Sequence, residues 1–300
     1  MFELRLLPAQ PGVFFREEDH KYFYTGEPYI EVPSSSRIIA LAGGKDFDKT
    51  RWRQSLLRKG LSESGAEYFM ERVRDIRADV GTRFHGMAGL SLGSFEQKEV
   101  APECPKDVEA AAIHKLWLKS VLPRIGKVYV IEEPMIHPGG CYGLTPDLVA
   151  EVDGIVTMCD WKSNQAEHYT ERYQRLSDYA PDDEILRGIC AHLANADYNA
   201  GKVKEVTARV RDGWQMQQGS YAFGVEAIHG LRHGLRVERG INFMLSVDGV
   251  KEHHWNRPDL DQGWLQFAGG LLLHHQRSVM AGGHAVFRSA LNALFPLMRA

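Results

Sequence analysis

Two aspartates and a lysine near the middle of the chain have types and spacing that could do chemistry. Asp147 and Asp160 lie on either side of the dipeptide Asp153-Gly154, which favours the left-handed backbone of a two-residue hairpin turn. If that dipeptide forms the turn, paired positions sum to 307 and Asp147 lies directly opposite Asp160. Lys162 shares the face of Asp160, because side chains on one face of a strand recur every second residue. The spacing therefore predicts that two carboxylates and an amine meet at one point.

Such a group has a chemical use and also a simpler explanation. Directly opposed carboxylates, with Cβ atoms roughly 4.5–5.5 Å apart, repel each other unless a cation lies between them. Hard ions such as Mg²⁺ prefer oxygen pairs of this kind together with substrate phosphate. The simpler explanation is a surface hairpin whose charges face water. The segments 148–152 and 155–158 are largely apolar, however, which predicts a buried hairpin in which charges need a reason. We therefore favour a functional site over a surface hairpin.

The composition narrows the class of protein. Three hundred residues with 44% hydrophobic content can build a sizeable core, and a formal charge of −3 confines any nucleic-acid surface to local patches. The four cysteines form no CxxC pair, which argues against a zinc ribbon or an iron–sulfur cluster and suits a reducing cytosol. No signal-peptide pattern begins the chain, and no apolar run approaches the roughly 20 residues of a membrane span. These features predict a cytoplasmic protein without a membrane partner.

The rest of the chain supplies elements that could hold the hairpin in place. Apolar spacing predicts helices over 66–92, 106–121, 214–229 and about 259–299, the last broken at Gly282-Gly283. A strand is expected over 128–136, before the hairpin, and a second hairpin over 241–255. This order predicts an α/β fold with a mixed central sheet flanked by helices. We expect one domain over 1–300, with a core at about 65–255 and a helical insertion at about 166–213.

Three residues on the expected helices could join the group. His85 lies in the second half of the first long helix, although a lone histidine on a helix is usually structural. Gln217 and Tyr221, four residues apart, share one face of the helix over 214–229. Either could also be an ordinary packing residue. Their spacing alone does not decide between a functional and a structural role.

With these residues placed, the chain resembles the PD-(D/E)XK nuclease superfamily, in its RecB-like and phage-exonuclease branch. The resemblance rests on motifs in order along most of the chain: Asp19-His20-Lys21-Tyr22 leading to Val32-Pro33-Ser34-Ser35, Gly81-Thr82 with His85, Glu133, Pro146-Asp147 with Asp160-Trp161-Lys162, and Gln217 with Tyr221. Each motif alone is weak, but five in the right order on the right elements are fairly specific. The chain departs from the family at Gly89, where an acid is common, and in the long segment between Lys162 and Gln217. A rival pair, Gln174 and Tyr179, has a spacing that is one residue too long.

The resemblance implies a restriction-endonuclease-like core and a metal-dependent DNA exonuclease of phage or bacterial recombination and repair. It implies that Asp147 and Asp160 hold one or two Mg²⁺ or Mn²⁺ ions, helped by the Trp161 backbone carbonyl and by His85. Lys162 would orient or deprotonate the attacking water. We expect no iron–sulfur cluster.

The resemblance also bears on substrate and partners. Gln217 and Tyr221 would position nucleotides, and Glu133 occupies the place of a glutamate that is frequent in the family. The implied partner is DNA, with a single-strand annealing or recombination protein as a further candidate and a homo-oligomer left open. If the chain is phage-encoded, it would act in the cytosol of the bacterial host.

Three other functions are weighed against the exonuclease. A non-specific endonuclease would use the same backbone contacts, and a non-catalytic DNA-binding relative would keep the fold alone. A zinc hydrolase built on His253-His254 and His274-His275 is disfavoured, because adjacent histidines point to different sides and no HExxH accompanies them. The basic residues are scattered over 51–59, 202–211 and 232–239, which suits contacts that ignore base sequence. With no dedicated recognition module in the sequence, an exonuclease is favoured.

Overall fold

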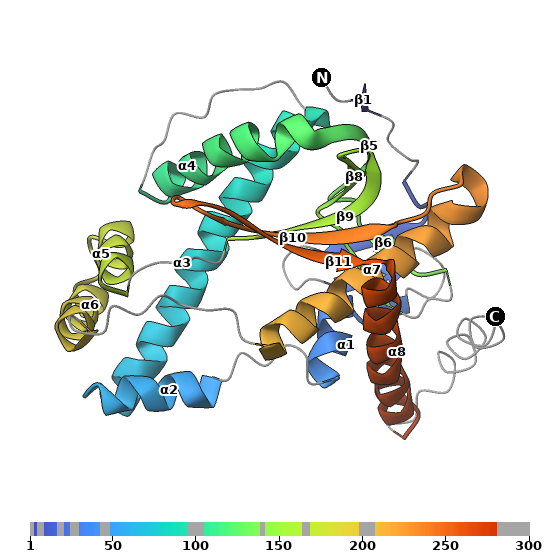
Figure 1. Ribbon diagram of the computed structural model, residues 1–300. Coiled ribbons are helices and arrows are strands. Elements are labelled where there is room, and N and C mark those ends of the chain that lie inside the picture. Colours follow the sequence, from blue (N-terminus) through green and yellow to red (C-terminus); the bar gives the residue numbers. More distant parts are fainter. Residues whose placement is uncertain are drawn as a thin grey trace.

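A six-stranded mixed sheet runs through the middle of the molecule (Figure 1). The computed structural model describes residues 3–4, 9–16, 21–24, 30–42, 49–94, 105–138, 142–163, 169–197 and 208–280. The strands, in spatial order, are β1 (Glu3–Leu4), β5 (Ile125–Ile131), β8 (Leu148–Val152), β9 (Ile155–Lys162), β10 (Arg239–Ser246) and β11 (Gly249–Asn256). Strands β5, β8 and β9 are antiparallel in succession, β10 is parallel to β9, and β11 is antiparallel to β10. The chain between β9 and β10 therefore makes the crossover that a parallel pair requires.

The β8–β9 hairpin has the turn and the register that its sequence predicts. Asp153 and Gly154 have φ angles of 53° and 77°, the positive values that a type I′ turn needs at both central residues. Cross-strand partners run from Val152 with Ile155 to Leu148 with Cys159, and every pair sums to 307. The next position in this register sets Asp147 opposite Asp160. The prediction of the hairpin register is confirmed.

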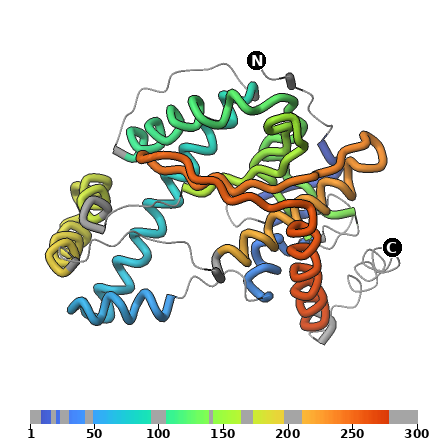
Figure 2. Tube along the Cα trace, in the orientation of Figure 1, coloured from blue at the N-terminus to red at the C-terminus, as the bar shows by residue number. Residues whose placement is uncertain are grey.

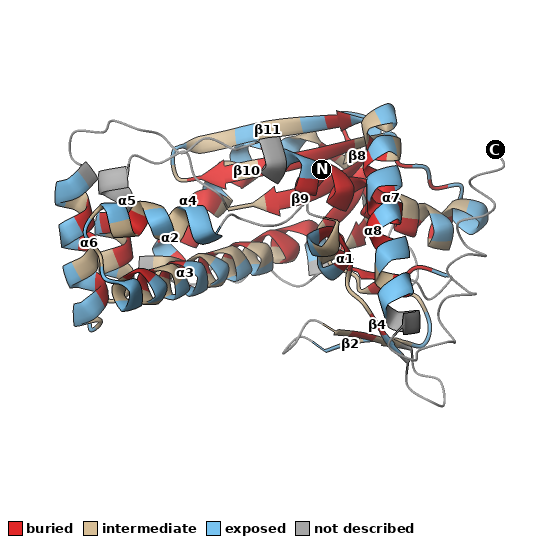
Figure 3. Ribbon diagram, turned by 90° about the horizontal axis from the view of Figure 1, so that it is seen from below, coloured by how far each residue is buried: buried red, intermediate tan, exposed pale blue. Residues whose placement is uncertain are grey.

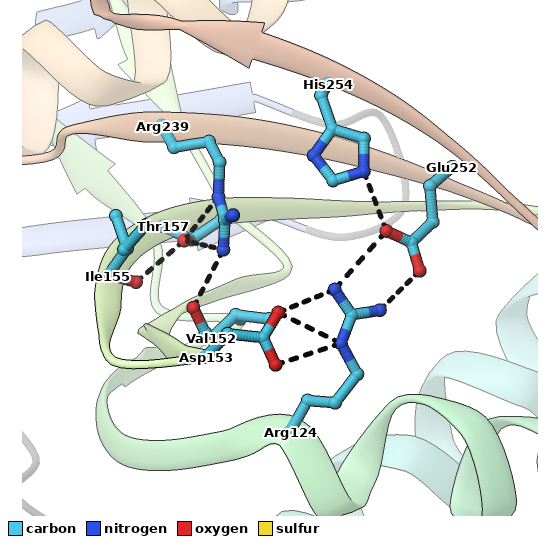
Figure 4. A network of polar contacts seen from close by, with 8 residues as sticks. All are labelled: Arg124, Val152, Asp153, Ile155, Thr157, Arg239, Glu252 and His254. Carbon is cyan, nitrogen blue, oxygen red and sulfur yellow. Dashed lines mark hydrogen bonds and ion pairs between the residues drawn. The ribbon is translucent and has the colours of Figure 1, made fainter.

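An ion-pair network holds the turn end of this hairpin (Figure 4). Arg124, directly before β5, donates to the Asp153 carboxylate at 2.8 Å and also pairs with Glu252 on β11. Arg239, at the start of β10, donates to the Val152 carbonyl oxygen at 2.7 Å. The hydrogen bond from Arg124 lowers the pKa of Asp153. The turn is thus tied to the strands on both sides of it.

Helices cover both faces of the sheet (Figures 1 and 2). One face carries α3 (Glu63–Gly89), which is followed by a kinked turn at Leu90–Ser94 where Gly93 has a positive φ of 99°, and α4 (Pro105–Ser120). The other face carries α1 (Ser35–Leu41), α7 (Ala208–His233) and α8 (Arg257–Met280). Burial follows the same layers, with buried residues along the strands and exposed ones on the outer sides of the helices (Figure 3). Burial of apolar area between these layers is the main source of stability.

Helices α7 and α8 cross with their backbones in contact. A Cβ atom on Gly219 would lie 2.4 Å from the backbone nitrogen of Trp264, and one on Gly263 would lie 2.2 Å from the Gln215 carbonyl oxygen. No side chain fits at these distances, so only glycine permits this approach. The crossing fixes the N-terminal half of α7 against the sheet. That half carries Gln217.

A second group of helices packs on the N-terminal half of α3, away from the sheet (Figures 1 and 3). It consists of α2 (Lys49–Arg58), α5 (Tyr169–Tyr179) and α6 (Glu184–Asp197). This helical arm has its own apolar core, which includes Leu56, Phe69 and Leu186. Helices α5 and α6 fall in the segment 166–213, for which the sequence predicts a helical insertion.

A small N-terminal sheet packs beside the open end of the hairpin. It is formed by β2 (Val13–Arg16), β3 (Lys21–Tyr24) and β4 (Ile30–Val32), and a further short pair is formed by β6 (Met135–Ile136) and β7 (Gly143–Leu144). The Tyr22 ring lies on Gly143, where a Cβ atom would be 2.1 Å from the ring. The Tyr22 hydroxyl is hydrogen-bonded to Thr145 at 2.6 Å, two residues before Asp147.

The expected fold class, a mixed α/β fold with a central sheet flanked by helices, is confirmed. The strand expected over 128–136 is wrong in its bounds: β5 ends at Ile131, and Met135–Ile136 is a separate strand. Glu132 has a positive φ of 43° and Pro134 lacks an amide hydrogen, which ends the ladder here. Helix α8 is the first of the two expected C-terminal helices, and the break at Gly282-Gly283 lies outside the described residues. Across the described ranges, no helix is both long and apolar enough to cross a membrane.

Candidate functional site

The open end of the hairpin brings Asp147, Asp160 and Lys162 together, with Asp160 and Lys162 on the sheet face that α7 covers. Lys162 donates to Asp160 Oδ1 at 2.8 Å, and its ammonium nitrogen lies 2.7 Å from Oδ2 in the same ion pair. Asp147 Oδ2 accepts a hydrogen bond of 2.6 Å from the Trp161 backbone N–H. The exposed fractions are 2% for the Asp160 side chain, 15% for Asp147 and 20% for Lys162. The group is thus buried at Asp160 and reaches solvent at Asp147 and Lys162.

The electrostatic environment of Asp147 is unfavourable for its charge. Burial, and next the charge of Asp160, raise the pKa of Asp147 to about 7. The charges of His85 and Lys162 and the Trp161 N–H act in the opposite direction but do not cancel the rise. A carboxylate whose pKa is raised by a second carboxylate is stabilised when a cation is added between them.

His85 approaches the two carboxylates from α3. Its Nδ1 atom lies 2.9 Å from Glu132 Oε1 and 3.9 Å from Asp147 Oδ1. Burial lowers the pKa of His85, but the hydrogen bond to Glu132 and the charge of Asp147 outweigh burial, so the pKa lies above its ordinary value. The histidine that the sequence singled out on this helix is therefore next to Asp147.

The glutamate in contact with His85 is Glu132, one residue before the Glu133 that the sequence suggested. The expected strand over 128–136 would have continued through both residues. Because β5 ends at Ile131 and Glu132 has a left-handed backbone, the chain turns here. The Glu132 amide donates to the Asp147 carbonyl oxygen at 3.2 Å, which keeps this turn beside the site. Burial raises the pKa of Glu133.

A chain of hydrogen bonds leads from Lys162 through α7 to α1. Lys162 Nζ donates to Gln217 Oε1 at 3.2 Å, and Gln217 Nε2 donates to the Tyr221 hydroxyl oxygen at 3.2 Å. The Tyr221 hydroxyl is also hydrogen-bonded to Ser35 at the start of α1. Gln217, Tyr221 and Ser35 are all buried. In this structure, Gln217 therefore contacts Lys162 directly, and Tyr221 supports Gln217.

Sequence reasoning missed Asn242 and Trp255. Asn242 Nδ2 donates to Asp160 Oδ2 at 2.6 Å, and Trp255 Nε1 donates to Asn242 Oδ1 at 2.6 Å. The available signal was a single amide in the apolar run Ile241–Leu245. Its meaning depends on the pairing of β10 with β9, which brings Asn242 next to Asp160.

Other residues considered from the sequence lie elsewhere. In the helical arm, Gln174 is bonded to Asp178 at 2.9 Å, and the Tyr179 hydroxyl is bonded to Glu109. His254 pairs with Glu252 at 2.8 Å, next to the hairpin turn (Figure 4). The histidines at 274 and 275 are neighbours on α8. The Asp19-His20 part of the N-terminal motif lies outside the described residues.

The donor set suits a hard cation shared with substrate. Among the residues that the structure describes, no three Cys, His, Asp or Glu side chains are arranged closely enough to hold a metal ion by themselves. Mg²⁺ rarely requires such a cage, because it keeps several waters and is usually bound by one or two carboxylates together with phosphate. Asp147 and Asp160 provide two carboxylates, and their mutual repulsion would be relieved by an ion. The residues therefore fit a divalent cation of this kind.

No protein-family model matches this chain, and no curated protein matches it significantly.

Proposed function

We propose that this chain is a metal-dependent DNA nuclease that hydrolyses phosphodiester bonds, and that it acts as an exonuclease. The observation that carries the proposal is the group at the open end of the hairpin. Two facing carboxylates lie together, a lysine is bonded to one of them, and an imidazole lies beside the other. Such a set can hold a hard cation against a phosphate and supply an amine to the same place.

The surroundings of the group support membership of the PD-(D/E)XK superfamily. The mixed sheet, with helices on both faces, is of the kind that a restriction-endonuclease-like core requires. Residues from several of the motifs that carry the resemblance come from distant parts of the chain and lie near the hairpin or are linked to it by hydrogen bonds. His85 contributes from α3 and Gln217 from α7, while Ser35 and Tyr22 join through Tyr221 and Thr145.

Asp147 and Asp160 would hold one or two Mg²⁺ or Mn²⁺ ions, with His85 and the Trp161 carbonyl as further ligands. When bound, such an ion lowers the pKa of a coordinated water and neutralises charge that develops on the phosphate. The raised pKa of Asp147 supports this assignment, since it reports a carboxylate with too little positive charge around it.

Lys162 would orient or deprotonate the attacking water and stabilise the charge of the reacting phosphate. In this structure its ammonium group is shared between Asp160 and Gln217. Once Asp160 shares its charge with an ion, Gln217 remains as the partner that directs the lysine. Tyr221, bonded to both Gln217 and Ser35, holds the Gln217 amide in place.

An exonuclease is favoured because the basic residues suit backbone contacts without base reading. In α2 the residues Lys49, Arg51, Arg53 and Arg58 occur without an acid in the same helix, and Arg53 is paired with Glu63 and Glu67 of α3. Arg51 and Arg58 are exposed, as are Arg232 and Arg236 near the end of α7. Basic contacts of this kind attach to phosphates and carry no sequence information. A non-specific endonuclease, the second candidate, would use the same contacts, and a recombination or annealing protein remains the proposed partner.

The test compares two forms of one DNA. Linear and covalently closed circular duplexes are incubated with the protein in Mg²⁺, in Mn²⁺ and in Zn²⁺, with the Asp160→Asn variant as a matched control. The expected result is release of nucleotides from the linear form in Mg²⁺ or Mn²⁺, no cutting of the circle, and no activity of the variant. Comparable cutting of the circle would favour the endonuclease. An inert protein would indicate a non-catalytic relative, and activity in Zn²⁺ alone would indicate a zinc hydrolase.

A further inference from the structure

Asn242 is a polar residue in the otherwise apolar run Ile241–Leu245 of β10. It is fully buried in β10, and its neighbours Ile241 and Phe243 are fully buried as well. Its partner across the parallel β9–β10 pair is Asp160. A buried amide destabilises the fold unless its polar atoms are hydrogen-bonded, so its partners must account for its presence here.

The two partners of Asn242 determine which way its amide points. The indole N–H of Trp255 can only donate, so the atom facing it has to be the amide oxygen. The NH₂ group must then face Asp160, to which it donates at 2.6 Å. This orientation follows from the chemistry of the indole, although the two ends of an amide have nearly the same shape. Asp160 Oδ2 is consequently required to be an acceptor.

We propose that Asn242 is a positioning residue, which holds the Asp160 carboxylate in the orientation that binds the divalent cation of the nuclease proposed above. The fixed hydrogen bond takes Oδ2, whereas Oδ1 is bonded to Lys162 in this structure and would be open to an ion when the lysine turns away. Lys162 also contacts both oxygens, but it is partly exposed and has Gln217 as a second partner. Asn242 has no such freedom, because its strand is internal to the sheet and Trp255 locks its amide. Asp160 thus keeps one fixed donor when the lysine turns toward water or phosphate.

A purely structural role is the alternative, because buried polar networks also specify how strands pair. The two roles differ in what a variant changes. Loss of a structural bond lowers stability alone, whereas loss of a positioning bond weakens ion binding in protein that is still folded. Gln218 on α7 provides the matched control. It is also a fully buried amide, and it donates to the Ile241 carbonyl oxygen at 3.3 Å on the same strand.

The experiment measures Mn²⁺ binding by electron paramagnetic resonance of the free ion, together with thermal unfolding of each protein. The proteins are wild type, Asn242→Leu, Trp255→Phe and Gln218→Met. Asn242→Leu is expected to weaken Mn²⁺ affinity by about 10- to 100-fold, the usual effect of removing a residue that orients a metal ligand. Trp255→Phe should weaken it by less, because the ring stays and only the indole N–H is lost. Gln218→Met should lower the unfolding temperature and bind Mn²⁺ as wild type does.

The outcomes separate this proposal from the nuclease assignment. Wild-type Mn²⁺ affinity in folded Asn242→Leu protein would overturn the positioning role and leave the nuclease assignment intact. If Asn242→Leu does not fold, Trp255→Phe decides, and an unchanged affinity in that variant overturns the proposal. Absence of Mn²⁺ binding by the wild-type protein would contradict the proposed function itself, and this inference with it.

Discussion

The two ends of the β8–β9 hairpin carry opposite electrostatics. At the turn end, Arg124 contacts the carboxylates of Asp153 and Glu252, and its hydrogen bond lowers the pKa of Asp153 (Figure 4). At the open end, Asp147 faces Asp160, and burial together with that second carboxylate raises the pKa of Asp147. One hairpin therefore carries a matched set of charges at one end and an unmatched set at the other.

This difference separates the end of the hairpin that contributes stability from the end that carries the candidate site. The turn end fixes the register, and the register alone places the two aspartates face to face at the other end. A protein that needed only stability would not keep a buried pair of like charges there. We propose that the open end is arranged for a cation supplied from solution, and the following variants test that proposal.

Removal of Lys162 should produce the largest effect at the open end. Lys162→Ala is expected to lower kcat for DNA cleavage by about 10²- to 10⁴-fold, the usual contribution of a group that transfers a proton in the reaction. DNA binding measured in Ca²⁺ should change little, because phosphate contacts come from several basic residues. The control is Lys127→Ala on β5, whose ammonium pairs with Glu151 at 3.4 Å and away from the site. Turnover at the wild-type rate in Lys162→Ala protein would exclude this lysine from the mechanism.

Neutralising Asp147 should stabilise the metal-free protein. Its pKa of about 7 in the folded state lies above the value of about 4 in an unfolded chain, so stability falls as pH rises from about 4 through 7. Asp147→Asn avoids that loss. Its free energy of unfolding at pH 8 in EDTA should exceed that of the wild type by about 1–3 kcal/mol. Urea unfolding at pH 5 and pH 8 measures the effect, which should shrink at the lower pH. A variant that is less stable than wild type at pH 8 would show that Asp147 is as well matched as Asp153.

Breaking the ion-pair network at the turn should lower the stability of the protein, the opposite of the effect expected for Asp147→Asn. Arg124→Met is expected to lower the free energy of unfolding by about 1–2 kcal/mol, because two partly exposed carboxylates lose their common partner. Mg²⁺ affinity of the folded variant should remain that of the wild type, and calorimetric titration measures it. A large loss of Mg²⁺ affinity in protein with an intact fold would mean that the two ends are not separable.

The smallest expected effect is a change in the pKa of His85, which distinguishes Glu132 from its neighbour Glu133. Glu132→Gln should lower the pKa of His85, because the hydrogen bond to Glu132 is a cause of its elevation. Glu133→Gln is the matched control and should leave the His85 titration unchanged. The measurement is an NMR titration of the histidine ring in both variants. If Glu133→Gln moves the titration and Glu132→Gln does not, the assignment of Glu132 to this contact is wrong.

Much of the site could be predicted because it depends on local rules. Two residues with a left-handed backbone define the turn, the turn defines the register, and the register places Asp147, Asp160 and Lys162. The face shared by Gln217 and Tyr221 likewise follows from helical geometry. Neither step requires knowledge of the rest of the fold.

The parts that could not be predicted depend on how distant segments pair. Asn242 contacts Asp160 only because β10 lies parallel to β9, with the whole helical crossover between them in sequence. Glu132 replaces Glu133 beside His85 because the backbone of Glu132 turns where a continuous strand was expected. A short sequence motif carries no information about either event.

The most direct test of the central claim is release of acid-soluble nucleotides from labelled linear duplex DNA by freshly purified protein. Wild type and Asp160→Asn are compared in Mg²⁺ and in EDTA, after circular dichroism has shown that both are folded. The predicted result is release by the wild type in Mg²⁺ alone, with the variant inactive in both conditions. Equal release by the two proteins, or release by the wild type in EDTA, would contradict a divalent-cation site at the open end of the hairpin.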